Sequence, residues 1–178
     1  GTGAATLGTI GAMAAFNDQV YVSSTYTGGG FIWRYRPSTD DYEYVMGWAG
    51  AWITSMVVFD GALHLAMNTG NYNVMTTAEV VTLQTVPASL FATWRGYLYR
   101  ADGADVYYTN ATGGVWSTPA IQVGEASEPI TGMAGMGDVD LYCAKTDGLY
   151  YIGTGDFVFG VTPWPTRDAD YGKGMIHH

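Results

Sequence analysis

Ser55-Met56-Val57-Val58-Phe59, followed by a turn at Asp60-Gly61 and then by Leu63-His64-Leu65, is the stretch of sequence that decides the fold. It predicts a strand of small and apolar residues, a tight polar turn and a second strand with alternating side chains. Three other segments have the same pattern: Ala12 to Phe16 with Val20 to Val22, Ser89 to Thr93 with Tyr97 to Tyr99, and Gly132 to Met136 with Leu141 to Cys143. The chain therefore contains a repeat.

The repeat has a period of about 40 residues. Alignment on Met13, Met56, Leu90 and Met133 gives spacings of 43, 34 and 43 residues. Such periods, with four short strands in each, are typical of the blades of a β-propeller, because one four-stranded sheet cannot bury both faces without neighbours. We therefore predict an all-β protein, a β-propeller of four-stranded antiparallel blades with about four blades in this chain. A β-sandwich with accidental similarity between segments is the alternative.

The predicted domain is a single propeller, or a segment of one, over residues 1–178, with blades at approximately 11–52, 53–86, 87–129 and 130–172. The predicted strands are 11–16, 19–25, 30–36 and 41–46 in the first blade, 54–59, 62–67, 72–77 and 79–84 in the second, 88–94, 97–101, 105–109 and 115–123 in the third, and 131–136, 140–145, 148–152 and 156–161 in the fourth. Helical content should be near zero, because no window keeps apolar residues at helical spacing without Gly, Pro or β-branched interruptions.

The sequence does not decide how the propeller ring closes. A fifth first strand is predicted around Met175, 42 residues after Met133. Two arrangements fit: a segment of a larger ring of five to eight blades, or a small ring that the two ends close by exchanging strands. We expect a segment or a multi-chain assembly, because an open arc exposes sheet faces and edges that associate. His177 and His178 are either native residues or the remainder of a purification tag.

Composition excludes several classes of protein. Seven Lys and Arg stand against sixteen Asp and Glu, a formal net charge of −9, which opposes binding of nucleic acid and of anionic membranes. Charged residues are only 13% and aromatic residues 15%, whereas disordered chains are charge-rich and aromatic-poor. No apolar run approaches the ~18 residues of a membrane span, so we predict no membrane insertion. The single cysteine excludes an internal disulfide framework and a cysteine-based zinc site.

Three hairpins resemble those of known propellers. Phe31 to Val45 resembles the hairpin of the third and fourth strands in kelch-like propellers, and Leu141 to Ile152 resembles a generic propeller hairpin. Tyr107 to Trp116 resembles the Asp-box hairpin of sialidase-like propellers, from which it departs at Ala111, where the family has Asp. These resemblances imply propeller architecture over nearly the whole chain and specify no single family.

The residues that a propeller glycosidase needs are not in place. Arg34 and Arg36 share one face of their predicted strand, and pairing with acidic neighbours explains them better than a carboxylate-binding cluster does. A five-bladed glycosidase needs carboxylates in its first strands near the axis, and the predicted first strands contain none. We therefore predict that the chain is not an enzyme and has no catalytic residues, no metal site and no cofactor. A degenerate glycosidase or lyase is the alternative.

Two residues with reactive side chains are predicted to be structural. His64 has no accompanying Ser or Asp motif and no metal-ligand partner, so we interpret it as a structural or solvent-facing residue. Cys143 stands between Tyr142 and Ala144 and is interpreted as a small buried hydrophobic residue.

The candidate ligand site lies in the loops that join fourth to first strands and second to third strands, which usually form the ligand-facing side of a propeller. Mapped onto this chain, the site consists of Tyr26, Trp48, Trp52, Tyr72, Asp102, Asp105, Trp164 and Tyr171, with Asp168 beside them. Aromatic faces next to carboxylates suit sugar rings, and aromatic residues also anchor protein interfaces. The alternative is that these aromatic side chains pack between blades.

The functional hypothesis is a non-enzymatic β-propeller binding or scaffold module that belongs to a larger assembly. Low lysine, abundant Gly, Thr, Tyr and Trp, and irregular blades resemble propellers of phage tails and other virion structural proteins. The expected partners are proteins of that assembly, a surface glycan, or both, and the chain is expected to be an oligomer or part of a longer chain. The expected location is virion or extracellular. A secreted carbohydrate-binding propeller without viral context is an alternative.

Overall fold

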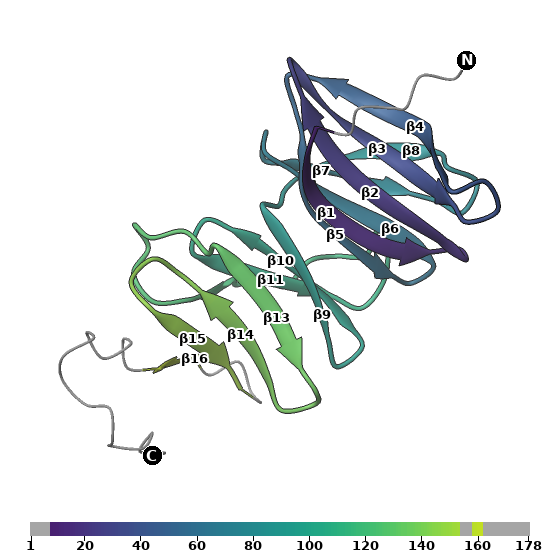
Figure 1. Cartoon of the computed structure of the whole chain (residues 1–178). Coiled ribbons are helices and arrows are strands. Elements are labelled where there is room, and N and C mark those ends of the chain that lie inside the picture. The colour runs from purple at the N-terminus through teal and green to yellow at the C-terminus, as the bar shows by residue number, and fades with distance from the viewer. Residues whose placement is uncertain (1–7, 154–157, 162–178) are drawn as a thin grey trace, which may run out of the picture.

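The computed structural model describes residues 8–153 and 158–161, and these residues form sixteen strands in four antiparallel sheets (Figure 1). Within each sheet the strands lie side by side in chain order. Sheet 1 contains β1 (Thr9–Phe16), β2 (Gln19–Tyr26), β3 (Gly29–Arg36) and β4 (Asp41–Ala49). Sheet 2 contains β5 (Ile53–Phe59), β6 (Ala62–Met67), β7 (Asn71–Met75) and β8 (Val81–Pro87).

Sheets 3 and 4 complete the arrangement. Sheet 3 contains β9 (Leu90–Trp94), β10 (Tyr97–Asp102), β11 (Asp105–Thr109) and β12 (Ile121–Gln122). Sheet 4 contains β13 (Gly132–Met136), β14 (Asp140–Ala144), β15 (Leu149–Ile152) and β16 (Val158–Val161). These sheets correspond to the four predicted blades, and no α-helix occurs among the described residues. The prediction of propeller blades, and not of a β-sandwich, is confirmed.

The fourth strand of the third blade is the one element that the sequence analysis placed wrongly. Residues 115–123 were expected to form a strand, but only Ile121–Gln122 pair with β11. Pro119 has no N–H to donate to a neighbouring strand. Trp116 instead turns inward, where its ring lies 6.2 Å from that of Tyr72 in sheet 2. A long loop therefore replaces most of the outer strand.

The core is divided into three hydrophobic clusters, each between two neighbouring sheets. Sheets 1 and 2 enclose a cluster that contains Tyr21, Ile32 and Leu65. Sheets 2 and 3 enclose a second cluster around Tyr72. Sheets 3 and 4 enclose a third, which contains Cys143 with none of its surface exposed. Blade-on-blade packing is therefore what buries the apolar residues, as the repeat predicted.

The first strands of the sheets lie next to one another, β1 beside β5, β5 beside β9 and β9 beside β13. Small residues allow this close approach. A Cβ atom on Gly135 of β13 would lie 2.6 Å from the carbonyl oxygen of Thr93 in β9, and one on Gly11 of β1 would lie 3.0 Å from that of Ile53 in β5. The predicted preference for small residues at the crowded inner edge therefore has a steric cause.

Several predicted residues lie outside the described ranges. These are Trp164, Asp168, Tyr171, His177, His178 and the fifth first strand around Met175. Among the described residues, no helix is long and apolar enough to cross a membrane.

Candidate functional site

The loops between second and third strands, and those between fourth and first strands, share one end of the sheets, because each strand runs antiparallel to the one before it. We call this end the loop face. It includes the turn at residues 27–28, the linker at 50–52, the loop at 68–70, the turn at 103–104 and the loop at 123–131. The ligand site that the sequence predicts lies at this end of the molecule.

Trp48 and Trp52 form an aromatic corner of the loop face between sheets 1 and 2. Both lie next to Gly30: Trp48 is its partner across the strand pair β3–β4, and the Cα atom of Trp52 would lie 2.5 Å from a Cβ atom on Gly30. Only glycine fits at this point, because any side chain would collide with the linker backbone. The linker is tied down further by the N–H of Gly50, which donates to the carbonyl of Gly28 at 2.8 Å.

The backbone of Trp52 is held on both sides by Asn68. The N–H of Trp52 donates to Oδ1 of Asn68 at 2.8 Å, and the N–H of Asn68 donates to the carbonyl of Trp52 at 3.0 Å. The Trp52 residue nevertheless leaves 41% of its surface exposed. Trp48 is half-buried and packs on the cluster between sheets 1 and 2. The corner thus presents a partly exposed tryptophan whose backbone is held by Asn68.

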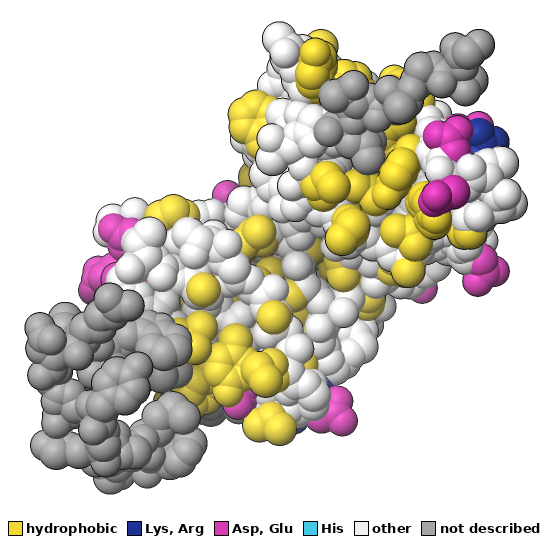
Figure 2. Space-filling model, viewed as in Figure 1, with side chains coloured by type: hydrophobic (Ala, Val, Ile, Leu, Met, Phe, Trp, Pro, Cys, Tyr) yellow, Lys and Arg dark blue, Asp and Glu magenta, His cyan; other side chains and the backbone are white. Residues whose placement is uncertain are grey.

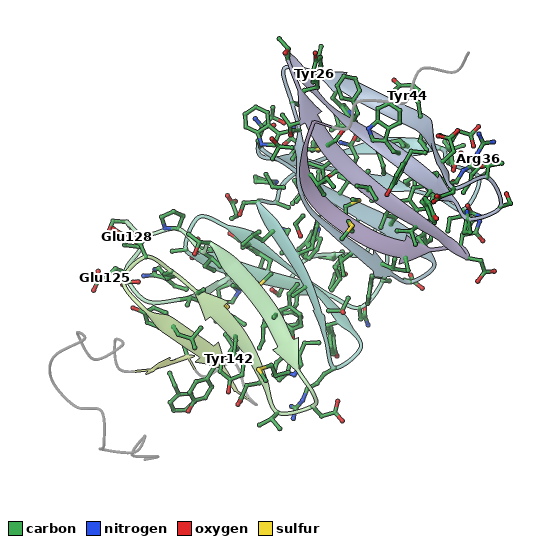
Figure 3. All side chains as sticks on the ribbon, in the orientation of Figure 1. Tyr26, Arg36, Tyr44, Glu125, Glu128 and Tyr142 are labelled. Atoms are coloured by element: carbon green, nitrogen blue, oxygen red, sulfur yellow. The ribbon has the colours of Figure 1, made fainter. Side chains whose placement is uncertain are left out.

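Tyr26 lies at the same end of sheet 1 but belongs to a different surface. It ends β2 opposite Gly29, with 57% of its surface exposed. Strand alternation places its side chain on the same side of the sheet as Val22 and Trp33, whereas Trp48 packs on the cluster toward sheet 2. The structure therefore places Tyr26, at the tip of sheet 1 (Figure 3), on the opposite face of this sheet from Trp48.

Tyr72 is a packing residue between sheets 2 and 3, with only 2% of its surface exposed. Its ring lies 5.1 Å from that of Phe91 and 6.1 Å from that of His64. Burial raises the pKa of its hydroxyl above the ordinary value of 10.0. Tyr72 cannot reach a ligand on the loop face, as the packing alternative anticipated.

Asp102 and Asp105 face each other across the tight turn of β10 and β11. Both are half-buried, and the Asp102 carboxylate lies 3.9 Å from the guanidinium of Arg100. Arg100 is 5% exposed and stacks over the ring of Tyr107 at 3.8 Å. The structure thus keeps these two aspartates together at the loop face of sheet 3. Sheet 3 lies in a different half of the molecule from sheet 1, whose last strand carries Trp48 (Figure 1).

A further acidic group on the loop face was not predicted. Glu125 and Glu128 lie in the loop before sheet 4, at the far end of the molecule from Tyr26 (Figure 3). Lys145, which is buried, donates from Nζ to the carbonyls of Val123 at 2.7 Å and Glu125 at 2.5 Å, and so fixes this loop. The position of this loop, between a fourth and a first strand, is visible in the sequence. Glu125 and Glu128 have no aromatic residue beside them in the sequence, and the predicted site was built around aromatic residues.

The four first strands, which lie nearest the propeller axis, contain no ionisable side chains. All of β1, β5, β9 and β13 lie within the described residues, and they contain no Asp, Glu, His, Lys, Arg or Cys. Among the described residues no group of three or more His, Cys, Asp or Glu is arranged to hold a metal ion. The arrangement offers surfaces for contact and no acid–base pair at the axis.

Three structural interpretations of charged or reactive side chains are confirmed. Arg34 pairs with Glu43 in its own sheet and with Glu79 of sheet 2 at 2.8 Å, and the hydrogen bond from Arg34 lowers the pKa of Glu43. Cys143 is fully buried, and burial raises the pKa of its thiol to about 12. His64, interpreted as structural or solvent-facing, is structural, since 1% of it is exposed.

Comparison with known proteins shows similarity in fold alone. The sequence matches no family profile, and no curated protein matches it in sequence. The structure is similar to the extracellular domain of the hybrid two-component system BT4673 from B. thetaiotaomicron, with a TM-score of 0.72 at 11% identity, over 93% of this chain and 23% of that one. It is also similar to Hsv2 from Kluyvelomyces marxianus, with a TM-score of 0.56 at 13% identity, over 82% of this chain and 50% of that one.

A chain of the mitotic checkpoint complex is similar as well, with a TM-score of 0.62 at 9% identity, over 86% of this chain and 50% of that one. The chain therefore spans between about a quarter and a half of the length of these similar chains. Together with the four sheets, these similarities establish a β-propeller fold. The kelch-like and Asp-box resemblances of single hairpins remain predictions.

Proposed function

We propose that the chain is a non-enzymatic propeller module that binds a carbohydrate at the aromatic corner of its loop face. One observation carries the proposal: Asn68 fixes the backbone of Trp52 on both sides while the residue remains 41% exposed. A residue whose backbone is already held loses less conformational entropy when a ligand binds to its side chain. A rigid aromatic face beside an amide is what a sugar ring needs, with C–H groups on the ring and hydroxyls on the amide.

The charge of the chain supports a neutral ligand. Its formal net charge is −9, which disfavours phosphate-rich partners and heavily sulfated glycans. The half-buried Asp102 and Asp105 and the exposed Glu125 extend the loop face as hydrogen-bond acceptors for hydroxyl groups. We therefore expect neutral oligosaccharides to bind better than acidic ones.

The setting of the module is part of the same proposal. Composition favours a structural or host-recognition part of a larger assembly, such as a phage tail, at a virion surface or outside the cell. The BT4673 domain is extracellular by its description, which supports an extracellular location. The viral setting depends on composition alone, since none of the similar structures reported above is described as a viral protein.

The absence of catalysis is proposed from the axial strands, which lack carboxylates. Its test is incubation with chromogenic aryl glycosides and with oligosaccharides found to bind. Turnover that is lost on substitution of a loop-face carboxylate such as Asp105→Asn would contradict a non-enzymatic role and would support the degenerate glycosidase.

The binding test is a glycan array followed by calorimetric titration of the oligosaccharides that bind. Trp52→Ala should weaken binding about tenfold or more, because truncation of a central aromatic contact commonly costs upwards of 1 kcal/mol. The variant should remain folded, since both bonds to Asn68 use the Trp52 backbone. The matched control is Tyr97→Ala: Tyr97 is 38% exposed and lies at the opposite end of the sheets.

Two results would overturn the proposal. One is that no neutral glycan binds to the folded protein. The other is that Trp52→Ala and Tyr97→Ala bind the same glycan as tightly as the unmodified chain, which would place the ligand elsewhere.

A further inference from the structure

Sheet 1 has an aromatic face that no other described sheet covers. The other face of this sheet packs on sheet 2, while this one, which we call the outer face of sheet 1, carries Met13, Val20, Phe31, Trp33, Tyr35, Tyr42 and Tyr44. Met13 is 64% exposed and Tyr44 54%. The rings contact one another, with Trp33 and Tyr44 5.6 Å apart edge-to-face. The face is thus ordered as a packed layer.

Sheet 4 has a corresponding face. Its inner side packs on sheet 3 through Leu141 and Cys143. The outer face of sheet 4 carries Ala134, Met136, Tyr142, Tyr151 and Phe159. Tyr151 and Phe159 stack with ring centroids 4.9 Å apart, and Met136 is 61% exposed. One charged residue, Asp140, lies at the turn end of this face.

Both outer faces turn to the same side of the molecule. In Figure 1 sheet 1 lies in front of sheet 2 and sheet 4 lies in front of sheet 3, so the two end sheets both face the viewer. Figure 2 shows hydrophobic side chains gathered over each of them in that view. The four sheets therefore form an open arc, and its two end faces look toward the part of a ring that would complete it.

We propose that a second copy of this chain completes the ring, with sheet 4 of each copy packed on sheet 1 of the other around a two-fold axis along the propeller axis. The result is a closed ring of eight blades, within the usual range of about four to eight. Each new contact continues the blade-on-blade packing that already joins sheets 1 to 4. Cyclic two-fold pairs are also the commonest form of closed assembly.

The two faces match in profile. Across sheet 4 the paired row runs from Ala134 through Tyr142 and Tyr151 to Phe159, from a small residue at the inner strand to a large ring at the outer one. Across sheet 1 the row ends on Trp33 and Tyr44. Neighbouring blades diverge outward, so the widest gap is filled by the largest side chains on both sides.

The area is sufficient for a stable pair. Partly exposed aromatic and methionine side chains leave roughly 50–120 Å² each in contact with water, so each outer face offers about 400–500 Å² of apolar surface. A two-fold pair forms two closing contacts at once and would bury on the order of 1,800 Å² in total. Stable interfaces bury about 1,200–2,000 Å².

The test is the mass of the 178-residue chain in solution, by native mass spectrometry and by light scattering during size-exclusion chromatography at micromolar concentration. We expect a single species of twice the 19.1 kDa chain mass. A monomer at these concentrations would overturn the proposal, since the face would then need no second copy. A ladder of higher oligomers would also overturn it, because head-to-tail contacts would then fail to close.

Variants locate the contact. Tyr44→Arg on sheet 1 and Phe159→Arg on sheet 4 should each convert the dimer to a monomer, while Val115→Arg, at a loop residue that is 94% exposed, should leave the dimer intact. A dimer that survives either end-face variant would contradict the proposal. Should a variant unfold, hydrogen exchange of the unmodified chain across a dilution series answers the same question: amides of β4 and β16 should lose protection as the dimer dissociates. The proposal is independent of carbohydrate binding, which uses the loop face.

Discussion

Acidification should destabilise this protein through one buried histidine. His64 lies between sheets 2 and 3, enclosed by the rings of Phe91 at 5.7 Å, Tyr72 at 6.1 Å and Phe59 at 6.2 Å. Its Nε2 atom is 3.2 Å from Oγ1 of Thr112, while Nδ1 has no hydrogen-bond partner among the described residues. Burial disfavours a second proton on the ring more than the nearby Phe59 carbonyl and Asp60 carboxylate favour it, so the pKa of His64 is lowered to about 4.

The pKa shift sets the size and the pH window of the effect. The ordinary pKa of histidine is 6.5, so the unfolded chain takes up a proton as the pH falls below 6.5, while folded His64 stays neutral until about pH 4. Stability is therefore full above pH 6.5 and declines between pH 6.5 and 4. At pH 4.5 the loss amounts to roughly 2–3 kcal/mol relative to pH 8, a large part of the ~5–15 kcal/mol that a domain possesses.

The assay is urea denaturation of the unmodified chain and of His64→Gln at pH 8 and pH 4.5. Glutamine stays neutral and keeps a donor for Thr112, so the variant should be less stable at pH 8 but should lose roughly 2–3 kcal/mol less on acidification. Carboxylates such as Glu43 titrate in both proteins and cancel in the difference. Equal losses in the two proteins would refute the argument, as would an imidazole resonance of folded His64 that titrates near pH 6.5.

Three further predictions concern packing. Gly135→Ala should lower the free energy of unfolding in urea by about 1–3 kcal/mol, because its Cβ atom would lie 2.6 Å from the backbone of β9. The control Gly132→Ala, whose Cβ atom would lie 3.5 Å from its nearest neighbour, should change it by less than about 0.5 kcal/mol. Equal losses in the two variants would contradict the steric argument. Cys143 should not react with a disulfide reagent at pH 8 in the folded protein and should react once per chain after unfolding, and rapid labelling of the folded state would refute its burial. Glu79 links sheets 1 and 2 by accepting a hydrogen bond from the hydroxyl of Tyr21 at 2.8 Å. Glu79→Ala should therefore lower the free energy of unfolding by about 1–2 kcal/mol, and Glu79→Gln by less. If Glu79→Ala leaves this free energy unchanged, the link adds no stability.

The sheets were predictable because their signals are local. Turns such as Asp60-Gly61, with positive φ at both residues, and strand alternation on either side depend on neighbouring residues alone. The order of strands followed from the repeat. The outer strand of sheet 3 was not predictable in this way, because Trp116 leaves the strand position to pack on Tyr72 and Arg100, and that contact joins residues distant in sequence.

The candidate site was predictable only in part, since position on the loop face follows from topology but exposure does not. Trp52 and Tyr72 both lie at this end of sheet 2, and both are aromatic residues near a turn. Trp52 is 41% exposed and Tyr72 2%. Two things cause this difference: which face of the strand a side chain occupies, and whether another sheet packs on that face. The local sequence indicates the first, but it does not indicate the second.

The same reasoning explains why the end faces are informative. Tyr72 in β7 and Tyr151 in β15 both belong to third strands, and each lies on the face of its sheet that is turned away from the preceding sheet. Tyr72 packs on Phe91 of sheet 3, whereas the ring contacts of Tyr151 among the described residues are with Tyr142 and Phe159 of its own sheet. The outer face of sheet 4 therefore carries the same kinds of aromatic side chain as the face that is buried between sheets 2 and 3. The proposed second copy would cover the first and last faces of the arc with the same blade-on-blade packing that buries the faces between sheets 1 to 4.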